Sequence, residues 1–448
     1  MTNATSTDLY EVTMAQSYLR EGMTRSATFS LFVRDLPPDR GFLVCAGLDS
    51  VLDFLSAYRV DADDVDVFAS VLGRRPEELA PLLGLEFQGE VRAVPEGRIV
   101  LAGEPLLEIT APLPQAQLVE TYVLNQLNHQ TAVASKCARC VLAAAGHPVV
   151  DFSLRRTHGI EAGHRAARLG ALVGFAGTSN VAAAHSEGLT AVGTMAHSYI
   201  EAFGTEEEAF KAFARSHPGP VTFLVDTYDT VRGVATAAHV LRDLGLGPGC
   251  AIRLDSGDLG ALAVQARTIL DAVGLQQTRI VASGGLDEFA VDRLVRSEVP
   301  IDTYAVGTRI GVCADAPYLD SAYKLVEYDS RPVMKLSSAK VTAPGRKQVY
   351  RRPGYADLIA LVEEQPPPDG VPLLESVMRE GRRVSERAEL DTARQRFMAD
   401  LAALPPRART IREPTAPKAE LSGRLSSLAV DVRRYIEKNL MGDAHRAV

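Results

Sequence analysis

From Pro148 onward, short apolar runs alternate with helix-length segments, and this alternation restricts the possible folds more than any other feature of the chain. The runs that we expect to form strands are 148–152, 171–175, 190–194, 221–225, 250–254, 279–283 and 302–306. Such repetition predicts parallel strands joined by crossover helices. So many units in succession favour an irregular TIM-like α/β barrel over an open sheet, with the loops after the strands gathered at one rim.

The rest of the chain predicts further parts around this barrel domain, which we expect to span residues 148–320. Residues 1–115 contain β-like runs separated by Pro- and Gly-bearing turns, which predict an N-terminal mixed α/β domain. Residues 116–147 have helical spacing and predict a connecting helical segment. Short runs over 321–360 predict hairpins that return to the first domain, and the charged segment 361–448 predicts a peripheral C-terminal helical region.

Composition and charge are those of an ordinary enzyme. The chain has 448 residues, 46% of them hydrophobic, which is enough for a sizeable core. A net charge of −8 argues against broad nucleic-acid binding. The sequence contains no apolar run of membrane-spanning length, and its first residues have neither a basic nor an apolar signal region. We therefore expect a cytoplasmic protein with no nucleic-acid or membrane partner.

The cysteine content also fits the expectation of a cytoplasmic protein. Five scattered cysteines indicate reduced thiols rather than a disulfide framework. Cys137 and Cys140 form a CxxC pair, but no second pair lies at metal-ligand spacing. We therefore interpret these two as small residues of a helix rather than as metal ligands.

Polar residues follow three of the expected strands, where ligands bind in α/β proteins. Arg155 and Arg156 follow the first strand, a small-residue turn at Gly177–Asn180 follows the second, and His197 follows the third. Guanidinium groups suit carboxylate or phosphate, such turns expose backbone N–H groups, and imidazole transfers protons or phosphoryl groups. These groups predict one pocket for a small anionic ligand.

The later strands end in carboxylates and glycine loops. Asp226 and Asp255 each follow a strand directly, Arg253 lies just before Asp255, and carboxylates there suit a ribose diol or Mg²⁺. The last two strands are followed by 283–285 and 307–308, whose glycines suit a phosphate cradle of backbone N–H groups. Together these residues predict a bound sugar phosphate, with a smaller acidic partner near the arginines.

Several phrases occur in order over roughly the first three quarters of the chain. They are TDLY at 7–10, DFSLRRTHG, GFAGTSN, GTMAHS, LVDTYD, RLDSGDL, ASGGLDE, YAVGT and DSAYKLVE. In this order and spacing the chain resembles the nicotinate phosphoribosyltransferase family, of the type II phosphoribosyltransferase fold. The resemblance implies the first, committed step of NAD salvage, in which nicotinate attacks C1 of 5-phosphoribosyl 1-pyrophosphate to give nicotinate mononucleotide and pyrophosphate. It also implies Mg²⁺ and coupling to ATP hydrolysis through a phosphohistidine.

The resemblance carries specific roles onto matching residues. His197 matches the family's phosphorylated histidine, with Ser198 or a nearby carboxylate expected to orient its ring. Phe152 matches the aromatic residue that stacks on the pyridine ring, and Tyr10 of a neighbouring subunit covers the other face, which implies a homodimer with shared active sites. Arg155 matches the residue beside the ring carboxyl group, with Arg156 adding charge.

The choice between nicotinate and nicotinamide depends on Ser179, which follows the expected substrate-binding residue Thr178. Related nicotinamide-using enzymes place an aspartate at this point of the turn. An aspartate accepts from the amide but repels the nicotinate carboxylate, whereas a serine hydroxyl donates to it. The acid is therefore the expected substrate.

The resemblance also implies a site for the sugar and its phosphates. Asp226 and Asp255 match carboxylates near the ribose and pyrophosphate, so with His197 they are the expected catalytic residues and, through pyrophosphate, the expected Mg²⁺ ligands. Arg253 stands where it contacts the diphosphate. The residues expected at the 5′-phosphate are Ser283, Gly284, Gly285, Gly307 and Thr308. Asp229 and Asp258 are interpreted as helix N-caps, and His158 has no assigned role.

Other functions stay open. A nicotinamide phosphoribosyltransferase is disfavoured by Ser179, and a quinolinate-using relative by the phrase around His197. A barrel lyase or isomerase acting on a sugar phosphate would share the glycine loops but not the ordered phrases. A non-catalytic scaffold of the same fold would have a broken site, and none of the matched positions is broken.

Overall fold

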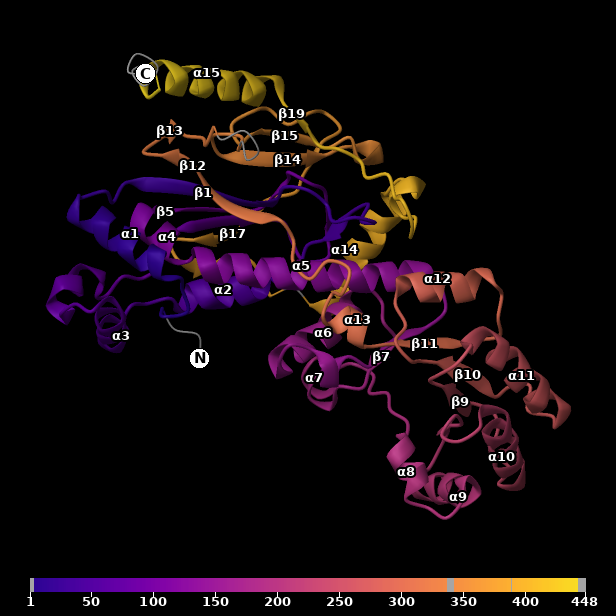
Figure 1. Ribbon diagram of the computed structural model, residues 1–448. Helices are drawn as coiled ribbons and strands as arrows, with labels where there is room; N and C mark the ends of the chain where they lie inside the picture. Colours follow the sequence, from indigo (N-terminus) through magenta and orange to yellow (C-terminus); the bar gives the residue numbers. More distant parts are fainter. Residues whose placement is uncertain (1–3, 337–341, 388, 442–448) are drawn as a thin grey trace, which may run out of the picture. The chain divides into compact units, whose positions relative to one another are not determined.

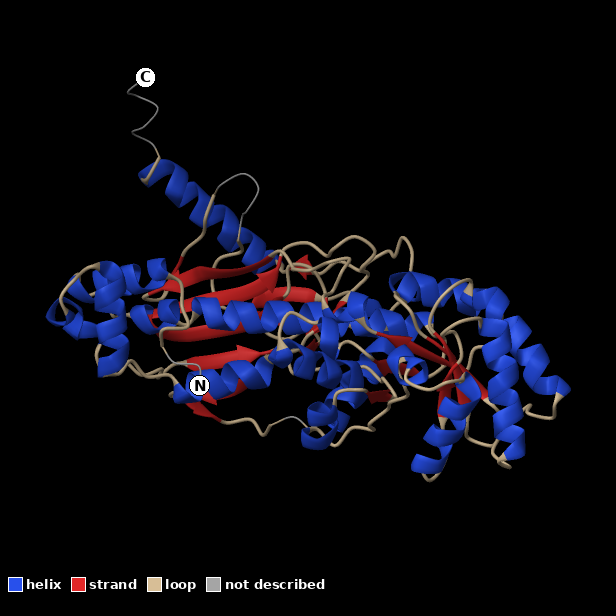
Figure 2. Ribbon diagram, turned by 60° about the horizontal axis from the view of Figure 1, so that its bottom comes forward, coloured by secondary structure: helices blue, strands red, loops and turns tan. Residues whose placement is uncertain are grey.

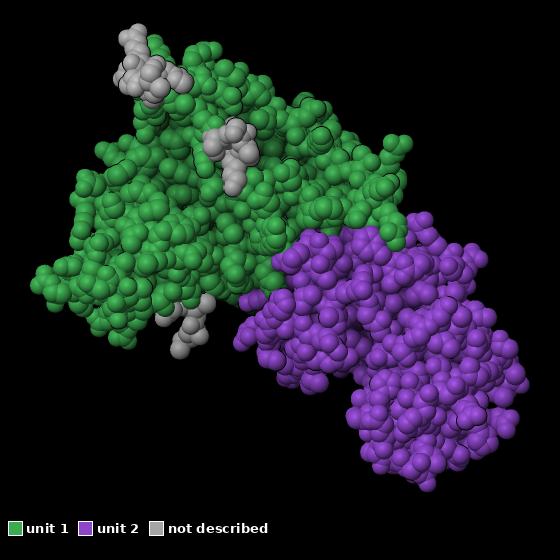
Figure 3. All heavy atoms as spheres, viewed as in Figure 1, with its two compact units in different colours: residues 1–132, 318–448 green, residues 133–317 purple. Residues whose placement is uncertain are grey.

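The computed structural model describes residues 4–336, 342–387 and 389–441. The chain divides into two compact units, which Figure 3 shows in different colours. Unit 1 comprises residues 1–132 and 318–448, and unit 2 comprises residues 133–317. The boundary falls within the long helix α5 (Glu120–Ala143), in the segment for which the sequence predicts a connecting helix.

Unit 1 is built around a seven-stranded sheet of order β13-β12-β1-β5-β3-β17-β18. Its strands are Arg331–Pro332, Ser321–Tyr328, Ser26–Val33, Pro105–Pro112, Glu90–Ala93, Glu375–Arg379 and Arg382–Arg383, in that order. The central strand β1 pairs antiparallel with both β12 and β5. Residues of 321–328 therefore return to the N-terminal strands, and strands from the carboxyl-terminal third extend the same sheet.

Both faces of this sheet are covered (Figures 1 and 2). On one face, Phe29 of β1 stacks on Tyr323, whose hydroxyl donates to the carbonyl of Ala116 in helix α4 (Leu113–Leu118). On the other face, Glu108 of β5 accepts from the backbone N–H of Lys347, 3.0 Å away, in strand β14 (Lys347–Arg351). The residues of β1 from Ala27 to Leu31, which alternate between the two faces, are therefore all buried.

The second face is covered by a four-stranded sheet of order β16-β14-β15-β19. Its other strands are Val371–Pro372, Leu358–Leu361 and Glu420–Leu421, and a further two-stranded sheet pairs Leu43–Val44 with Ile99–Val100. The remaining helices of unit 1 are α1 (Leu9–Arg20), α2 (Leu48–Ala57), α3 (Ala62–Leu72), α14 (Leu390–Ala403) and α15 (Gly423–Asn439), with 3-10 turns at Pro76–Leu82, Pro353–Tyr355 and Pro406–Ala408. The segment 361–448 thus contributes strands as well as the expected helices.

Unit 2 is a six-stranded parallel sheet of order β7-β6-β11-β10-β9-β8. Its strands are Gly177–Thr178, Val149–Asp151, Thr303–Val306, Arg279–Ala282, Ala251–Leu254 and Thr222–Leu224, in that order. The intervening helices are α6 (Ile160–Leu172), α7 (Val181–Ser186), α8 (His197–Glu201), α9 (Glu206–Ser216), α10 (Thr230–Asp243), α11 (Leu259–Ala272), α12 (Glu288–Arg296) and α13 (Thr308–Gly311), with a 3-10 turn η2 at Leu154–Arg156. Five of the seven expected strands form where the sequence predicts them.

Side-chain caps start several of these helices directly after the strand-end loops. Asp229 accepts from the backbone N–H of Arg232 at 2.8 Å, and Asp258 accepts from that of Ala261 at 3.1 Å. Each cap satisfies one of the N–H groups that a helix leaves unpaired in its first turn. The interpretation of Asp229 and Asp258 as N-caps is confirmed.

Two strand predictions are wrong, and the sheet is a half-barrel. The run 171–175 is the end of helix α6 with the turn after it, because a short apolar run has no periodicity that separates a buried helix end from a strand. The run 190–194 contributes only an isolated bridge between Ala191 and Thr178. Within residues 133–317, all of which the structure describes, β7 and β8 are the edges of an open parallel sheet. The closed TIM-like form is not seen, although the α/β class is.

Candidate active site

The candidate site lies at the carboxyl edge of the unit 2 sheet. Strand β9 lies between β8 and β10 and pairs in parallel with both. Since the carboxyl ends of neighbouring parallel strands meet at one edge, the loops after these strands come together. Asp226, Asp255 and Ser283, which are far apart in sequence, therefore become neighbours.

Arg253 is the centre of this cluster. It is the third residue of β9, and only 8% of it is exposed. Its Nε donates to Ser283 Oγ at 2.7 Å, and its two terminal nitrogens donate to Thr194 Oγ1 at 3.0 Å and Asp255 Oδ1 at 2.6 Å. Its Cζ atom lies 5.3 Å from the ring centroid of Phe152. Three partners thus hold the planar guanidinium in one orientation beside an aromatic ring.

Asp255 is kept ionised by its neighbours. Burial alone would raise the pKa of its carboxyl group, but the hydrogen bond from Ser283 and the positive charge of Arg253 outweigh burial. His197 contributes in the same direction, so the net pKa of Asp255 is lowered. A carboxylate in this state accepts hydrogen bonds from hydroxyl groups at neutral pH.

The two carboxylate oxygens of Asp226 differ in their hydrogen bonding. Its Oδ2 accepts from the backbone N–H of Asp255 at 3.0 Å and from Ser256 Oγ at 2.6 Å. Its Oδ1 is buried and has no hydrogen-bond partner among the described residues. A buried carboxylate oxygen is costly unless a donor or a cation reaches it, so the site suits a ligand that brings one.

A dedicated metal cage is not part of this arrangement. Within the described ranges, no group of three or more His, Cys, Asp or Glu side chains is arranged to hold a metal ion. Mg²⁺ commonly binds through one or two carboxylates together with substrate phosphates. The single unsatisfied oxygen of Asp226 fits an ion that arrives with a diphosphate.

His197 is the first residue of α8 and is half-buried. Its Nδ1 lies 3.1 Å from Thr227 Oγ1, so a threonine orients the ring in place of the expected Ser198 or a carboxylate. Thr227 follows β8, directly after Asp226. His197 and the carboxylate loop are therefore joined by a hydrogen bond.

Asp151 organises the loops after β6 and β7. It is fully buried, its Oδ2 accepts from Thr178 Oγ1 at 2.7 Å, and its Oδ1 accepts from the backbone N–H of Ser153 at 2.8 Å. Burial raises the pKa of this carboxyl group, and the hydrogen bonds from Ser153 and Thr178 oppose the rise. The backbone N–H of Ser179 donates to the Asp151 carbonyl at 2.8 Å, so this residue fixes the turn that carries both Thr178 and Ser179.

The glycine loops approach neighbouring backbone closely. Gly284 has φ +92°, and a Cβ there would lie 1.8 Å from the carbonyl oxygen of Asp255. A Cβ at Gly307 would lie 2.7 Å from the carbonyl oxygen of Phe152. Only glycine fits these positions without moving the backbone of the adjacent loop.

An ion pair joins the two glycine loops. Asp287, three residues after Gly284, accepts from the backbone N–H of Ala290 at 2.9 Å and pairs through its other oxygen with Arg309. Burial would raise the pKa of Asp287, but the Ala290 hydrogen bond and Arg309 lower it further than burial raises it. Arg309 follows Thr308, so the pair holds the loops after β10 and β11 together.

A buried charge cluster joins helix α5 to the segments that follow these loops. Lys136, on α5 and 1% exposed in its side chain, pairs with Glu288 and lies 2.8 Å from Asp315 Oδ1. Arg139 Nε donates to Glu288 Oε1 at 3.0 Å. Two basic residues in an apolar stretch of helix are the available sequence signal for this cluster, since its acidic partners lie about 150 to 180 residues away.

Arg155, Arg156 and Tyr10 are among the expected site residues that lie outside this network. Arg155 and Arg156 are exposed on η2, directly after β6 and Phe152. Tyr10 belongs to unit 1, where it lies on α1 and is 47% exposed. The network of described contacts therefore joins His197, Asp226, Asp255, Arg253, Ser283 and Phe152, but not these three.

An ordered arginine, two carboxylates, a histidine and two glycine loops at the edge of a parallel sheet define an α/β enzyme site for a phosphate-bearing ligand. Comparison with known proteins narrows this class. Residues 5–128 match the family model of the nicotinate phosphoribosyltransferase N-terminal domain, and residues 148–296 match the model of the nicotinate phosphoribosyltransferase family.

Individual proteins similar to this chain belong to the same family as the matching family models. A nicotinate phosphoribosyltransferase of Mycobacterium tuberculosis is 45% identical over 433 residues, covering 94% of this chain and 93% of its own. The crystal structure of human nicotinic acid phosphoribosyltransferase matches with a TM-score of 0.83 at 28% identity, covering 95% of this chain and 99% of that one. A nicotinate-nucleotide pyrophosphorylase of Pyrococcus furiosus matches with a TM-score of 0.75 at 26% identity, covering 89% and 95%. The chain belongs to the nicotinate phosphoribosyltransferase family and is an enzyme. Among the described helices, none has the length and apolar character that crossing a bilayer requires.

Proposed function

We propose that this enzyme transfers the phosphoribosyl group of 5-phosphoribosyl 1-pyrophosphate to nicotinate, giving nicotinate mononucleotide and pyrophosphate in NAD salvage. The observation that carries this proposal is the junction of Arg253, Asp255 and Ser283 at the ends of β9 and β10, beside Asp226 and the Phe152 ring. It supports a diphosphate and ribose site next to an aromatic platform. The named relative from M. tuberculosis supports the same activity.

The reaction depends more on the positioning of the two substrates than on acid or base catalysis. Cleavage at C1 passes through an oxocarbenium-like state, so rate is gained by holding the ring nitrogen in line and stabilising the departing pyrophosphate. In this proposal Arg253 binds the diphosphate, Asp255 accepts from ribose hydroxyls and Phe152 stacks on the pyridine ring. The loops at Gly284–Gly285 and Gly307–Thr308 hold the 5′-phosphate through backbone N–H groups.

Asp226, with Asp255 beside it, is the residue that would hold Mg²⁺ together with pyrophosphate oxygens. The unpartnered Oδ1 of Asp226 supports this assignment. When bound, the ion supplies positive charge beside the leaving group.

We further propose that ATP hydrolysis is coupled to the reaction through His197. In the tautomer that donates from Nδ1 to Thr227, Nε2 carries the lone pair. Nε2 then accepts the γ-phosphoryl group as ADP leaves, and water later removes that group as phosphate. The position of His197 near Asp255 supports an effect of phosphorylation on the diphosphate site.

The shared-site homodimer also belongs to this proposal. Tyr10 exposes nearly half of its surface on α1, which suits a side chain supplied to a neighbouring subunit.

Arg155 and Arg156 are exposed cations available to the nicotinate carboxylate. Ser179 stands where a nicotinamide-using enzyme needs an acceptor, so its hydroxyl favours the acid over the amide. The five cysteines, all free and buried, are compatible with the cytoplasmic location expected from the sequence.

One assay tests the main reaction. The full chain is incubated with 5-phosphoribosyl 1-pyrophosphate, Mg²⁺ and either nicotinate or nicotinamide, with and without ATP, and the mononucleotide is quantified. We expect product from nicotinate and stimulation by ATP. Failure to form nicotinate mononucleotide refutes the proposal, and equal turnover of nicotinamide refutes the role of Ser179.

Variants separate the parts of the mechanism. Asp226→Asn is expected to lower kcat/KM about 10²-fold to 10³-fold, a loss typical of removing one electrostatic contact to the transition state. Asp258→Asn is the matched control, because asparagine caps a helix as well as aspartate does. His197→Ala should keep a basal rate and lose ATP stimulation; ATP stimulation that survives in this variant excludes the phosphohistidine.

A further inference from the structure

The hydroxyl group of Thr178 is hydrogen-bonded inside unit 2. Thr178 is the last residue of β7 and is 1% exposed. Its Oγ1 donates to Asp151 Oδ2 at 2.7 Å and accepts from the backbone N–H of Asn180 at 3.0 Å. The single proton of this hydroxyl is therefore used within the protein, and the side chain joins β6 to the turn after β7.

Ser179 lies between these two hydrogen-bonded residues. Its backbone N–H donates to the Asp151 carbonyl oxygen at 2.8 Å. The next residue, Asn180, caps α7 by accepting from the backbone N–H of Ala183 at 3.1 Å. The Ser179 side chain is half-buried and forms no hydrogen bond with the described residues. The backbone around Ser179 is therefore fixed on both sides, while its hydroxyl is available to a ligand.

The carboxylate of Asp151 also holds the loop that carries Phe152. Its Oδ1 accepts from the backbone N–H of Ser153 at 2.8 Å. Strand β6 lies between β7 and β11 and pairs in parallel with both. One fully buried side chain therefore joins the two loops that carry Phe152 and Ser179, the residues proposed to stack on the pyridine ring and to select its acid form.

We propose that Asp151 is a positioning residue for nicotinate recognition, which holds the Ser179 hydroxyl in place through Thr178. This role rests on that of Ser179 in the proposed function and adds two residues that act through it. Binding groups must be held within about 0.5 Å of their productive position, and supporting hydrogen bonds supply that precision. Nicotinate binding therefore depends on two buried side chains behind the residue that meets the substrate.

The negative charge of Asp151 and its hydrogen bonds affect nicotinate binding in opposite directions. A carboxylate near an anionic substrate repels it, so removal of the charge by itself favours nicotinate. The amide of asparagine has one acceptor oxygen, so Asp151→Asn keeps the hydrogen bond from Thr178 or the one from Ser153, but not both in this geometry. A rise in the KM for nicotinate therefore reports lost positioning, and a fall reports lost repulsion.

The test measures the KM for nicotinate and for 5-phosphoribosyl 1-pyrophosphate in the full chain. Thr178→Val removes the hydroxyl without changing charge, and it should raise the KM for nicotinate about tenfold and that for 5-phosphoribosyl 1-pyrophosphate less than about twofold. Asp151→Asn should raise the KM for nicotinate as well. Thr178→Ser restores the hydroxyl and should recover most of the loss seen in Thr178→Val.

Asp302→Asn is the matched control. Asp302 is an exposed carboxylate directly before β11, and its Oδ2 accepts from the backbone N–H of Ile280 at 2.7 Å. It therefore holds a backbone group as Asp151 does, but at the amino-terminal edge of the same sheet. This variant should keep both KM values.

A double-mutant cycle checks that the effect passes through Ser179. In the Ser179→Ala background, Thr178→Val should cost nothing more in kcat/KM for nicotinate, whereas fully additive losses overturn the proposal. An equal rise in both KM values also overturns it, since that is the result of a merely structural role. A KM for nicotinate that stays unchanged or falls in Asp151→Asn and Thr178→Val has the same consequence.

Further outcomes separate the role of Asp151 from the function on which it rests. If Asp151→Asn does not fold, Thr178→Val and its recovery in Thr178→Ser decide the question. A raised KM for nicotinate in Ser179→Ala, with no rise in the other two variants, overturns only the role of Asp151. An unchanged KM in Ser179→Ala overturns the role of Ser179, and absence of nicotinate mononucleotide with wild type overturns the proposed function itself.

Discussion

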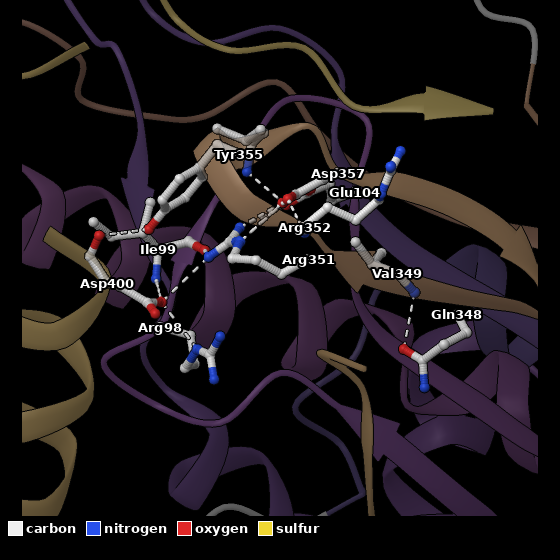
Figure 4. A network of polar contacts seen from close by, with 11 residues as sticks. Arg98, Ile99, Glu104, Gln348, Val349, Arg351, Arg352, Tyr355, Asp357 and Asp400 are labelled. Carbon is white, nitrogen blue, oxygen red and sulfur yellow. Dashed lines mark hydrogen bonds and ion pairs between the residues drawn. The ribbon is translucent and has the colours of Figure 1, made fainter. Parts of the chain in front are cut away.

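Replacement of Arg351 by methionine tests how unit 1 holds its carboxyl-terminal segment. The buried guanidinium of Arg351 donates to Asp357 Oδ2 at 2.7 Å, to the carbonyl oxygen of Ile99 at 2.7 Å and to Asp400 Oδ2 at 3.3 Å (Figure 4). Its Cζ atom lies 4.0 Å from the ring centroid of Tyr355. Methionine keeps most of the apolar stem but removes every donor.

The expected loss of stability depends on which hydrogen bonds the carboxylates keep once the Arg351 guanidinium is gone. Asp400 still accepts from Arg98 Nε at 2.9 Å and from the Ile99 N–H at 2.8 Å, so its charge stays paired. The side chain of Asp357, which is 1% exposed, keeps one hydrogen bond among the described residues, from the Arg352 N–H at 3.4 Å. Removing one partner of a buried ion pair costs about 3–5 kcal/mol. We expect the lower end, about 3 kcal/mol, because Asp400 stays paired and Glu104, whose Oε2 lies 3.9 Å from the guanidinium, still accepts from the Leu101 N–H.

Hydrogen exchange measured by mass spectrometry gives the local free energy of opening for each unit separately, which matters in a chain with two units. Peptides from β14, β15 and α14 should exchange faster in Arg351→Met, while peptides from the unit 2 sheet should not change. Arg352→Met is the matched control, because Arg352 pairs with Asp369 at the surface and its loss should leave exchange almost unchanged. Equal exchange in the two variants refutes the reasoning.

Three further predictions concern the glycine loops and a buried acid. Gly284→Ala should lower kcat/KM at least about tenfold, because its Cβ meets backbone 1.8 Å away, and an unchanged rate at unchanged thermal stability contradicts this. Arg309→Ala, which removes the ion pair to Asp287, should raise the KM for 5-phosphoribosyl 1-pyrophosphate about tenfold and leave that for nicotinate nearly unchanged, with Arg296→Ala of an exposed pair as the control. Burial, then the charge of Asp357, raises the pKa of Glu104 well above its usual value, so wild type should lose stability relative to Glu104→Gln as the pH rises above about 4.5. Urea unfolding curves that keep a constant difference across pH exclude this raised pKa.

The strands of unit 2 show where the local sequence pattern is enough to predict secondary structure. The runs at 148–152, 221–225 and 250–254 are apolar, short and bounded by turn residues, and each contains a strand of the sheet. The run 171–175 has the same composition, but it lies at the end of an amphipathic helix whose buried face it completes. Composition could not separate these cases, because the partner surface that buries a residue decides whether it is helix or strand.

The sequence by itself determined the family, the parallel α/β class and the residues at the strand ends, because these depend on local periodicity and on ordered phrases that survive without knowledge of contacts. Only the tertiary structure decided which of those residues act together. Arg253 meets Ser283 and Thr194, His197 meets Thr227, and Asp287 meets Arg309, although the partners are 22 to 59 residues apart. The order of the strands in the sheet determines which of these side chains come into contact. That order results from the packing of the whole sheet rather than from any single segment.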